Sequence, residues 1–405
     1  MKVLIYGEYF LPIVGGVQTA VDLLASGLAQ LAPAKLSENG KRIEVTLVTR
    51  TAAGEMDDSA RSYRVVRRPG FSELVRLIRE ADLVHVAGPC FLPLAIANLL
   101  RKPTVIEHHG YQAICPNGML FLEPSHTLCP GHFMKARYGE CLRCCSQTMG
   151  FIGSVRYLAL MFPRRWLCRR VAANITISDH VGRRLELPRS RTIYYGTDDS
   201  YSVTHREVPL RSNAIEVAYV GRLVTEKGVP VLLQAAQHLK DRGVAFKLTV
   251  IGDGPERSRL EELAERLGLK GSVTFRGDLR GVDLDEAVSG IAVLVMPSVC
   301  EETLGMSAIE QMMRGRVVIA ADIGGLSEVV GDAGLKFPAG DSHALASCIE
   351  RVVGDVPLMA SLGSAARARA LRLFRQDRMI DAHVSLYREV LLRRESRRHA
   401  PPALQ

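Results

Sequence analysis

The feature that most constrains the fold is a regular alternation of strand-like and helix-like segments across residues 215–320. Ile291–Met296 is an unbroken apolar run, which is typical of a parallel strand buried on both faces. The alternation predicts a parallel, doubly wound α/β sheet. We expect strands at 215–220, 246–251, 273–276, 291–296 and 317–320, and helices at 229–241, 255–267, 283–289 and 304–313.

The first half of the chain shows a similar alternation with longer connections. We expect strands at 3–6, 43–49, 83–86, 104–107, 174–178 and 192–195, and helices at 18–30, 71–80, 92–100 and 181–185. A chain of 405 residues is long enough for two α/β domains, and the polar segment 199–214 predicts the linker between them. Further helices are expected at 342–353, 357–373 and 376–393, with disorder beyond Glu395.

Two glutamates flank the turn that follows the strand 291–296. Glu302 lies in the turn, and Glu310 lies eight residues further on, about 12 Å along a helix axis. Between them, Leu304 and Gly305 leave free amides at a helix N-terminus, which favours an anion. This order matches the sugar hydroxyls, diphosphate and ribose hydroxyls of a nucleotide-sugar. The alternative is an ordinary strand-to-helix connection with surface glutamates.

A glycine-bounded loop follows the strand 215–220. It reads Gly-Arg-Leu-Val-Thr-Glu-Lys-Gly and contains Arg222 and Lys227. Ligands of open α/β sheets bind at the carboxyl ends of the strands, and two cations suit a diphosphate. We therefore expect both cations at the same site as the two glutamates.

Together these motifs resemble family 4 of the retaining nucleotide-sugar glycosyltransferases (glycosyl transferases group 1), which have the GT-B fold. The matching pieces are Gly-Arg-Leu…Glu-Lys-Gly (221–228), Val-Ile-Gly-Asp-Gly-Pro (250–255), Glu302-x7-Glu310 and Gly-Gly-Leu-Ser-Glu (324–328). The resemblance implies an α/β protein with two Rossmann-like doubly wound domains facing across a cleft. It implies a first domain at 1–205 with a cysteine-rich insert at 111–150, a second domain at 206–375, and a crossover helix and tail at 376–405.

The activity implied is transfer of a sugar, with retention, from a UDP- or GDP-sugar to an alcohol or lipid-linked sugar acceptor. Such a reaction serves the biosynthesis of cell-surface glycans, glycolipids or glycosylated metabolites. By the resemblance, Arg222 and Lys227 neutralise the diphosphate as the glycosidic bond breaks, assisted by the amides of Leu304 and Gly305. Glu302 is expected to hold the sugar hydroxyls and Glu310 the ribose hydroxyls. No catalytic metal is expected.

Two candidate residues lie in the first half of the chain. Alignment with the family pattern selects His109 to contact the reacting sugar, although Gly110 stands where the family has Asp. Gly16, in a glycine pair before the helix 18–30, lets the backbone approach donor or acceptor. The alternatives are a loop histidine and a plain turn. Tyr195 stands where the family usually has Asn.

The net charge of +9 and the pI near 9.2 favour anionic partners. The basic residues concentrate between 135 and 191, and no nucleic-acid module or aromatic-interleaved basic run is present, so we expect no nucleic-acid partner. No apolar run is long enough to span a membrane, and the N-terminus does not read as a signal peptide. We expect a cytoplasmic protein.

Residues 151–171 mix apolar side chains with arginines and contain Pro163, which is expected to break or kink a helix. The segment is either an interfacial amphipathic helix beside anionic lipid or a buried helix with a basic last turn. The first alternative makes the inner membrane face a partner of the basic first domain.

Five of the nine cysteines fall between 115 and 145. In a cytoplasmic protein such clustering indicates metal or redox chemistry before disulfides. We expect a structural zinc held by Cys115, Cys129, Cys141 and Cys144, with His126 or His132 able to replace one thiolate. An iron–sulfur cluster, free thiols and disulfides are the alternatives.

Two rival functions remain on the same fold. One is a sugar phosphorylase or an epimerase. The other is a non-catalytic sugar- or lipid-binding protein, against which the intact set of Arg222, Lys227, Glu302 and Glu310 argues.

Overall fold

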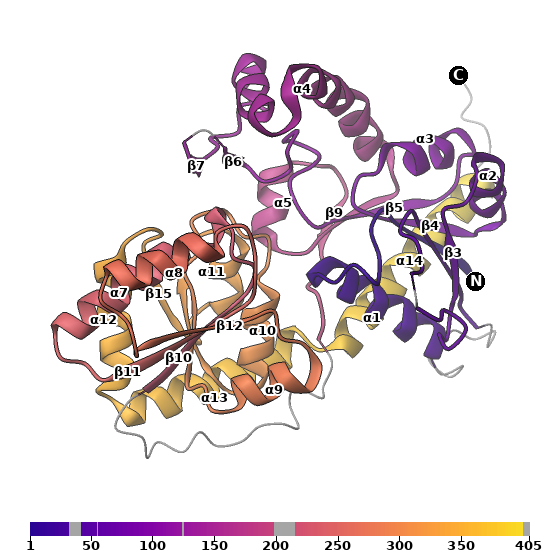
Figure 1. Cartoon of the computed structure of the whole chain (residues 1–405). Coiled ribbons are helices and arrows are strands. Elements are labelled where there is room, and N and C mark those ends of the chain that lie inside the picture. Colours follow the sequence, from indigo (N-terminus) through magenta and orange to yellow (C-terminus); the bar gives the residue numbers. More distant parts are fainter. Residues whose placement is uncertain (32–41, 55, 124, 198–214, 400–405) are drawn as a thin grey trace. The chain divides into compact units, whose positions relative to one another are not determined.

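The computed structural model describes residues 1–31, 42–54, 56–123, 125–197 and 215–399 (Figure 1). The chain divides into two compact units. The first comprises Met1–Met119, Gly131–Asp198 and Phe374–Gln405, and the second comprises Leu120–Pro130 and Asp199–Leu373. The expected linker at 199–214 and the expected boundary at 205 lie outside the described residues.

The first unit is a seven-stranded parallel sheet with the order β3-β2-β1-β4-β5-β8-β9. The strand order reverses beside β1, and such a switch point is where ligands bind in doubly wound sheets. Its strands are β1 Lys2–Gly7, β2 Glu44–Thr49, β3 Arg64–Arg67, β4 Leu83–Ala87, β5 Thr104–His108, β8 Ala173–Thr176 and β9 Ser190–Thr192. Its helices are α1 Gly16–Gln30, α2 Phe71–Glu80, α3 Phe91–Leu99, α4 Tyr138–Arg170, α5 Asp179–Leu185 and α14 Gln376–His399.

The second unit is a six-stranded parallel sheet with the order β12-β11-β10-β13-β14-β15. The order reverses beside β10, so this sheet is doubly wound as expected. Its strands are β10 Ile215–Val220, β11 Phe246–Ile251, β12 Val273–Gly277, β13 Val293–Met296, β14 Val317–Ala321 and β15 Leu335–Phe337. Its helices are η2 Thr225–Lys227, α7 Val229–Asp241, α8 Arg257–Arg266, α9 Gly281–Ser289, α10 Met306–Met313, α11 Gly324–Val330, α12 Ser342–Val353 and α13 Val356–Leu373. A two-stranded hairpin, β6 Phe121–Leu122 with β7 Thr127–Leu128, is grouped with this unit.

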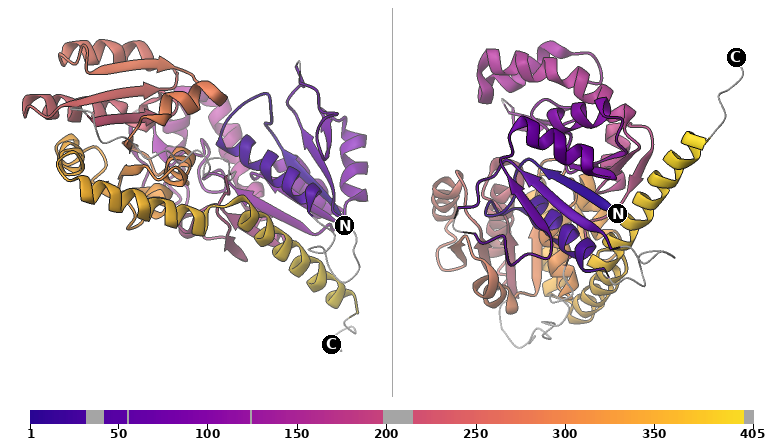
Figure 2. Two further views of the ribbon diagram at one scale, coloured as in Figure 1. Left: turned by 90° about the horizontal axis from the view of Figure 1, so that it is seen from below. Right: turned by 90° about the vertical axis from the view of Figure 1, so that its right-hand side faces the viewer.

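The last helix, α14, packs against α1 of the first unit (Figure 2). Gly27 makes the close approach possible, because a Cβ there would lie 2.0 Å from Cδ1 of Ile380. A buried polar cluster also joins α14 to the sheet. Nε2 of His383 lies 3.3 Å from Oε1 of Glu107, and the hydroxyl of Tyr387 is hydrogen-bonded to Nδ1 of His85 at 2.7 Å.

Three expectations about the backbone are wrong. Helix α4 continues through Pro163, and its non-helical residue is Gly150, whose positive φ of 67° suits glycine. Helix α14 extends to His399, where disorder was expected beyond Glu395. Strand β3 was missed, because it is short and begins and ends with arginine.

Candidate functional site

The strongest cluster of charged groups in the second unit is built on an ion pair between Lys227 and Glu302. Lys227 ends η2, just after β10, and Glu302 lies between β13 and α10. Nζ of Lys227 lies 2.5 Å from Oε1 of Glu302, and the two side chains are 19% and 11% exposed. Ser298 donates its hydroxyl hydrogen to the same carboxylate oxygen at 2.6 Å. The structure therefore brings together two of the residues that the sequence singled out.

Both partners of this pair stay charged. Burial raises the pKa of Glu302, but the nearby Lys227 and the hydrogen bonds from Lys227 and Ser298 outweigh it, so the pKa lies below its usual value. Burial lowers the pKa of Lys227, but Glu302 outweighs it and the pKa is raised. The site thus holds a fixed positive charge beside a fixed carboxylate at neutral pH.

Arg222 adds a second cation, whose side chain is 71% exposed. Its backbone carbonyl accepts a hydrogen bond from the hydroxyl of Tyr219 at 2.7 Å, which holds the loop in place. Its guanidinium lies 3.8 Å from Glu226 and acts on the pKa of both Lys227 and Glu302. The anchored backbone and exposed guanidinium suit a side chain that closes on an anionic ligand.

Two glycines allow the loops around this cluster to touch. A Cβ at Gly252, where φ is +134°, would lie 1.9 Å from the carbonyl oxygen of Gly221. A Cβ at Gly324, where φ is +65°, would lie 2.5 Å from the carbonyl oxygen of Glu302, and the amide of Gly325 donates to that oxygen at 2.6 Å. Glycine residues of the motifs that carried the resemblance therefore pack directly against the backbone of the loops that carry Arg222 and Glu302.

Helix α10 places the remaining second-unit candidates. Gly305 is its N-cap, with left-handed backbone, and Leu304 is buried. Glu310 lies on α10 in a different environment from the ion pair, where its electrostatic neighbours are Arg314 and Asp285. Burial raises the pKa of Glu310 to about 7, and its carboxyl makes no hydrogen bond to the described residues. Such a carboxyl suits hydrogen bonding to the hydroxyls of a ligand.

A separate candidate site lies in the first unit, in a cavity of about 1300 Å³. Residues that follow each of the first five strands line it, together with one face of α4. The strand-following residues are Glu8, Arg50, Arg68, Gly88 and His109. A cavity at the carboxyl ends of parallel strands is the usual ligand site of such sheets.

His109 is held in this cavity by a residue that the sequence did not assign to the site. Nδ1 of His109 is hydrogen-bonded to the hydroxyl of Tyr195, whose pKa burial holds well above its usual value. The phenol has no other partner in the described part of the chain, and we infer that it donates to Nδ1, with the hydrogen of His109 on Nε2. Nε2 is buried without a protein partner among these residues. Burial lowers the pKa of His109 to about 4, so the ring is neutral.

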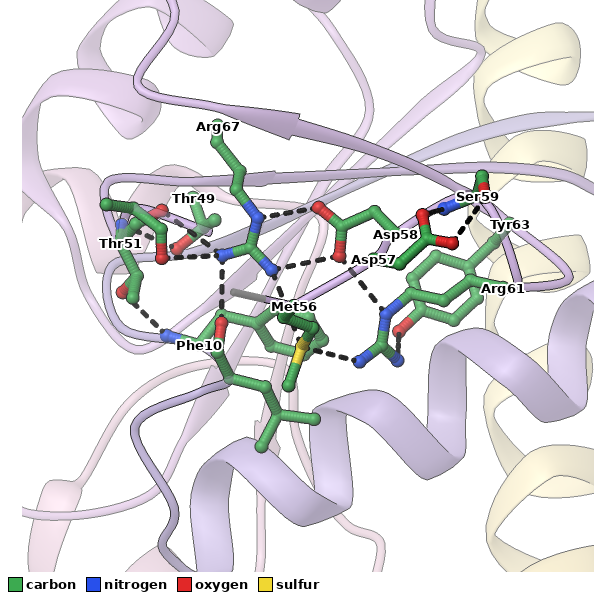
Figure 3. A network of polar contacts seen from close by, with 12 residues as sticks. Phe10, Thr49, Thr51, Met56, Asp57, Asp58, Ser59, Arg61, Tyr63 and Arg67 are labelled. Atoms are coloured by element: carbon green, nitrogen blue, oxygen red, sulfur yellow. Dashed lines mark hydrogen bonds and ion pairs between the residues drawn. The ribbon is translucent and has the colours of Figure 1, made fainter. Parts of the chain in front are cut away.

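Gly16 begins α1, but the cavity is lined by the next residues, Val17 and Gln18, rather than by Gly16. A polar network holds the loop before this helix (Figure 3). Arg67 pairs with Asp58 at 2.6 Å and donates to the carbonyl of Leu11 at 2.8 Å. The loop that carries the glycine pair is thereby fixed beside the cavity.

The four cysteines expected to bind zinc are buried and free of disulfides. Asn117 accepts from Sγ of Cys115 at 2.9 Å and donates to Sγ of Cys144 at 3.7 Å. Cys141 lies near Cys144 on the first turns of α4, and Cys129 follows β7. Within the described ranges, no group of three or more His, Cys, Asp or Glu is arranged to hold a metal ion. The structural zinc therefore stays a prediction.

Comparison with known proteins agrees with these motifs. Residues 202–369 match the family described as "Glycosyl transferases group 1". The 2-deoxystreptamine glucosyltransferase of Streptomyces kanamyceticus is 30% identical over 235 residues, which are 53% of this chain and 60% of that protein. The sulfoquinovosyl transferase SQD2 of Arabidopsis thaliana is 33% identical over 312 residues, 73% of this chain and 54% of that protein. The chain thus spans about half to two thirds of the length of these relatives.

Solved structures resemble the chain over nearly its whole length. HepE of Anabaena, solved in complex with UDP and glucose, superposes with a TM-score of 0.67 at 18% identity, covering 96% of this chain and 99% of that one. Sucrose-phosphate synthase of Thermosynechococcus elongatus superposes with a TM-score of 0.70 at 21% identity, covering 97% and 99%. At these identities the likeness shows the fold. The chain therefore has the GT-B fold, and residues 202–369 of it match the glycosyl transferases group 1 family.

Proposed function

We propose that this protein transfers a sugar from a nucleotide-diphospho-sugar to an alcohol acceptor with retention of configuration. The observation that carries the proposal is the cluster of Arg222, Lys227 and Glu302 at the carboxyl ends of β10 and β13. The HepE structure contains UDP and glucose, so a UDP-sugar is the first donor to test, and a GDP-sugar is the second.

The residues of the second unit suit the charge that develops in this reaction. As the anomeric carbon separates from the diphosphate oxygen, negative charge builds on the leaving phosphate, and Lys227 and Arg222 stabilise it. Glu302 fixes the position of Lys227 and accepts hydrogen bonds from sugar hydroxyls, while Glu310 accepts from the ribose. The acceptor oxygen bonds to the anomeric carbon on the face that the diphosphate leaves, and the acceptor proton passes to the leaving phosphate.

The test is release of nucleoside diphosphate from a panel of UDP- and GDP-sugars, with the anomeric configuration of the product read by NMR. Lys227→Ala is expected to lower turnover at least 100-fold, since a buried charge-assisted contact to the leaving group is lost. Lys247→Ala is the matched control, because Lys247 is 63% exposed on β11. Near-normal turnover in Lys227→Ala, or release without transfer to any acceptor, would refute the proposal.

We also propose that the protein works at an anionic membrane surface. The side chains of Phe151, Ile152 and Trp166 on α4 are 69%, 85% and 50% exposed, so the buried-helix alternative is wrong for them. The guanidinium of Arg170 lies 4.4 Å from the ring centroid of Trp166. No helix in the described ranges is both long and apolar enough to cross a bilayer. Exposed apolar side chains beside arginines are typical of interfacial helices.

Co-sedimentation with vesicles tests this association. Wild-type protein is expected to bind vesicles that contain phosphatidylglycerol and to bind pure phosphatidylcholine weakly. Ile152→Ser with Trp166→Ser is expected to abolish the binding. Equal sedimentation of wild type and double variant would contradict it.

A further inference from the structure

The cavity of the first unit carries an excess of positive charge that the transfer of a neutral sugar does not explain. Four guanidiniums line it, and the single carboxylate among the lining residues is Glu8. Glu8 is already engaged, because it pairs with Arg50 at 3.4 Å and accepts from the hydroxyl of Tyr6 at 3.1 Å. The other three arginines, Arg68, Arg156 and Arg164, make no ion pair in the described part of the chain.

These arginines converge on the cavity from separate elements. Arg50 and Arg68 follow β2 and β3, and Arg156 and Arg164 lie two turns apart on α4. Neutral groups hold two of them in place. Arg68 donates to the carbonyl of Arg50 at 3.1 Å, and Arg164 donates to the carbonyl of Gln112 at 3.3 Å. Nε of Arg164 is buried and has no partner within the described residues.

The same cavity also has features that suit a ring with hydroxyls. Tyr9 and Tyr157 line it, and so does His109, whose Nε2 has no partner within the described residues. Guanidiniums bind phosphate through two parallel N–H donors and remain charged at every physiological pH. A walled cavity with one sign of charge concentrates ligands of the other sign.

We propose that the acceptor bound in this cavity carries a phosphate ester, which Arg68, Arg156 and Arg164 hold while its hydroxyl-bearing ring lies beside His109. The inference rests on the proposed glycosyl transfer for the identity of this ligand as an acceptor. A diamine acceptor such as 2-deoxystreptamine would be repelled by the same arginines. A free sugar or cyclitol phosphate and the diphosphate headgroup of a lipid-linked sugar present the same chemistry.

Binding is tested first, without turnover, by calorimetry on the full chain with myo-inositol, myo-inositol 1-phosphate and 2-deoxystreptamine. The phosphate ester is expected to bind at least tenfold more tightly than the neutral cyclitol, the diamine is expected not to bind, and the advantage is expected to shrink as salt rises. Arg156→Gln and Arg164→Gln are each expected to remove about tenfold of that advantage. Arg169→Gln, an exposed charge on the same helix outside the cavity lining, is the control.

Turnover then separates this inference from the proposed function. With an active donor, the cavity variants are expected to raise the acceptor KM and leave the donor KM unchanged. Equal binding of neutral and phosphorylated cyclitols, or a change confined to the donor KM, would overturn the inference while leaving glycosyl transfer intact. Arginine-dependent phosphate binding in a protein that releases no nucleoside diphosphate would instead overturn the proposed function. Activity only with a lipid diphosphate-linked sugar would assign the headgroup as the source.

Discussion

Replacement of Tyr195 by phenylalanine is expected to damage the site through His109 while leaving the cavity shape unchanged. With the phenol donating to Nδ1 of His109, as inferred above, the ring hydrogen stays on Nε2, which has no protein partner in the described residues. Tyr195→Phe removes only that hydroxyl. It leaves a buried nitrogen unsatisfied and frees the ring to change tautomer.

An unsatisfied buried polar atom costs about 1–3 kcal/mol. When this cost falls on the transition state, kcat/KM is expected to drop about five- to 150-fold. Nitrogen-15 NMR of labelled protein is expected to show a neutral His109 with its hydrogen on Nε2 throughout the neutral pH range. The sign follows from the pKa of about 4, since the ring gains its second proton only below that pH. In Tyr195→Phe, signal from the other tautomer is expected to appear.

A double-mutant cycle distinguishes positioning from general packing. Tyr195→Phe is expected to have no further effect on turnover in a His109→Ala background, because the phenol acts through the ring. Additive losses in the two variants would refute this reasoning. So would an unchanged tautomer in Tyr195→Phe.

Three further predictions follow from buried titratable groups and from the thiols. Because the pKa of Glu310 is about 7, its carboxylate is formed only as pH rises through neutrality; the donor KM is expected to fall between pH 6 and 8 in wild type and to stay constant in Glu310→Gln. Burial raises the pKa of Glu107, but the adjacent imidazoles of His383 and His85 outweigh it and hold the pKa well below its usual value. The Glu107 carboxylate therefore stabilises the fold fully above the usual glutamate pKa, and this stabilisation is lost as the pH falls through the lowered pKa. Glu107→Gln is expected to lower the free energy of unfolding by about 3–5 kcal/mol at pH 7 and by much less in acid. Thermal melts of wild type and variant at the two pH values would show the difference. Elemental analysis of protein purified without chelator is expected to find one zinc per chain if the predicted thiolate site forms, and a metal-free protein with four reactive thiols would exclude it.

The second unit was predictable from local patterns because each of its strands is a short apolar run between helical segments. The helix at 229–241 and the strand at 246–251 have the expected bounds. The strand expected at 192–195 lies at Ser190–Thr192, so only Thr192 of the expected range belongs to it, because its pairing with β8 and not its apolar content decides where it lies. The exposed face of α4 was ambiguous in the sequence, since alternating apolar and basic residues fit both a buried and an interfacial helix.

The sites themselves were only partly predictable. Glycine-rich turns at strand ends indicated which loops bind a ligand, and so pointed to Lys227 and Glu302 before any contact was known. Ser298 carried no such signal, because a serine after a strand is common, and its hydrogen bond to Glu302 depends on the path of one turn. Tyr195 was visible only as a departure from the family pattern.

The positions of most strands and helices along the chain, and the loops rich in glycine and charge, are predictable from the sequence alone, because they depend on hydrophobic periodicity and on backbone preferences that act over a few neighbouring residues. The order of the strands in each sheet depends on pairing between distant residues and required the tertiary structure. Contacts between distant residues required the tertiary structure. Lys227 and Glu302 are 75 residues apart, and His109 and Tyr195 are 86 residues apart. Their protonation states depend on burial and on a partner that only the folded chain supplies, since desolvation and Coulomb attraction are properties of position in space.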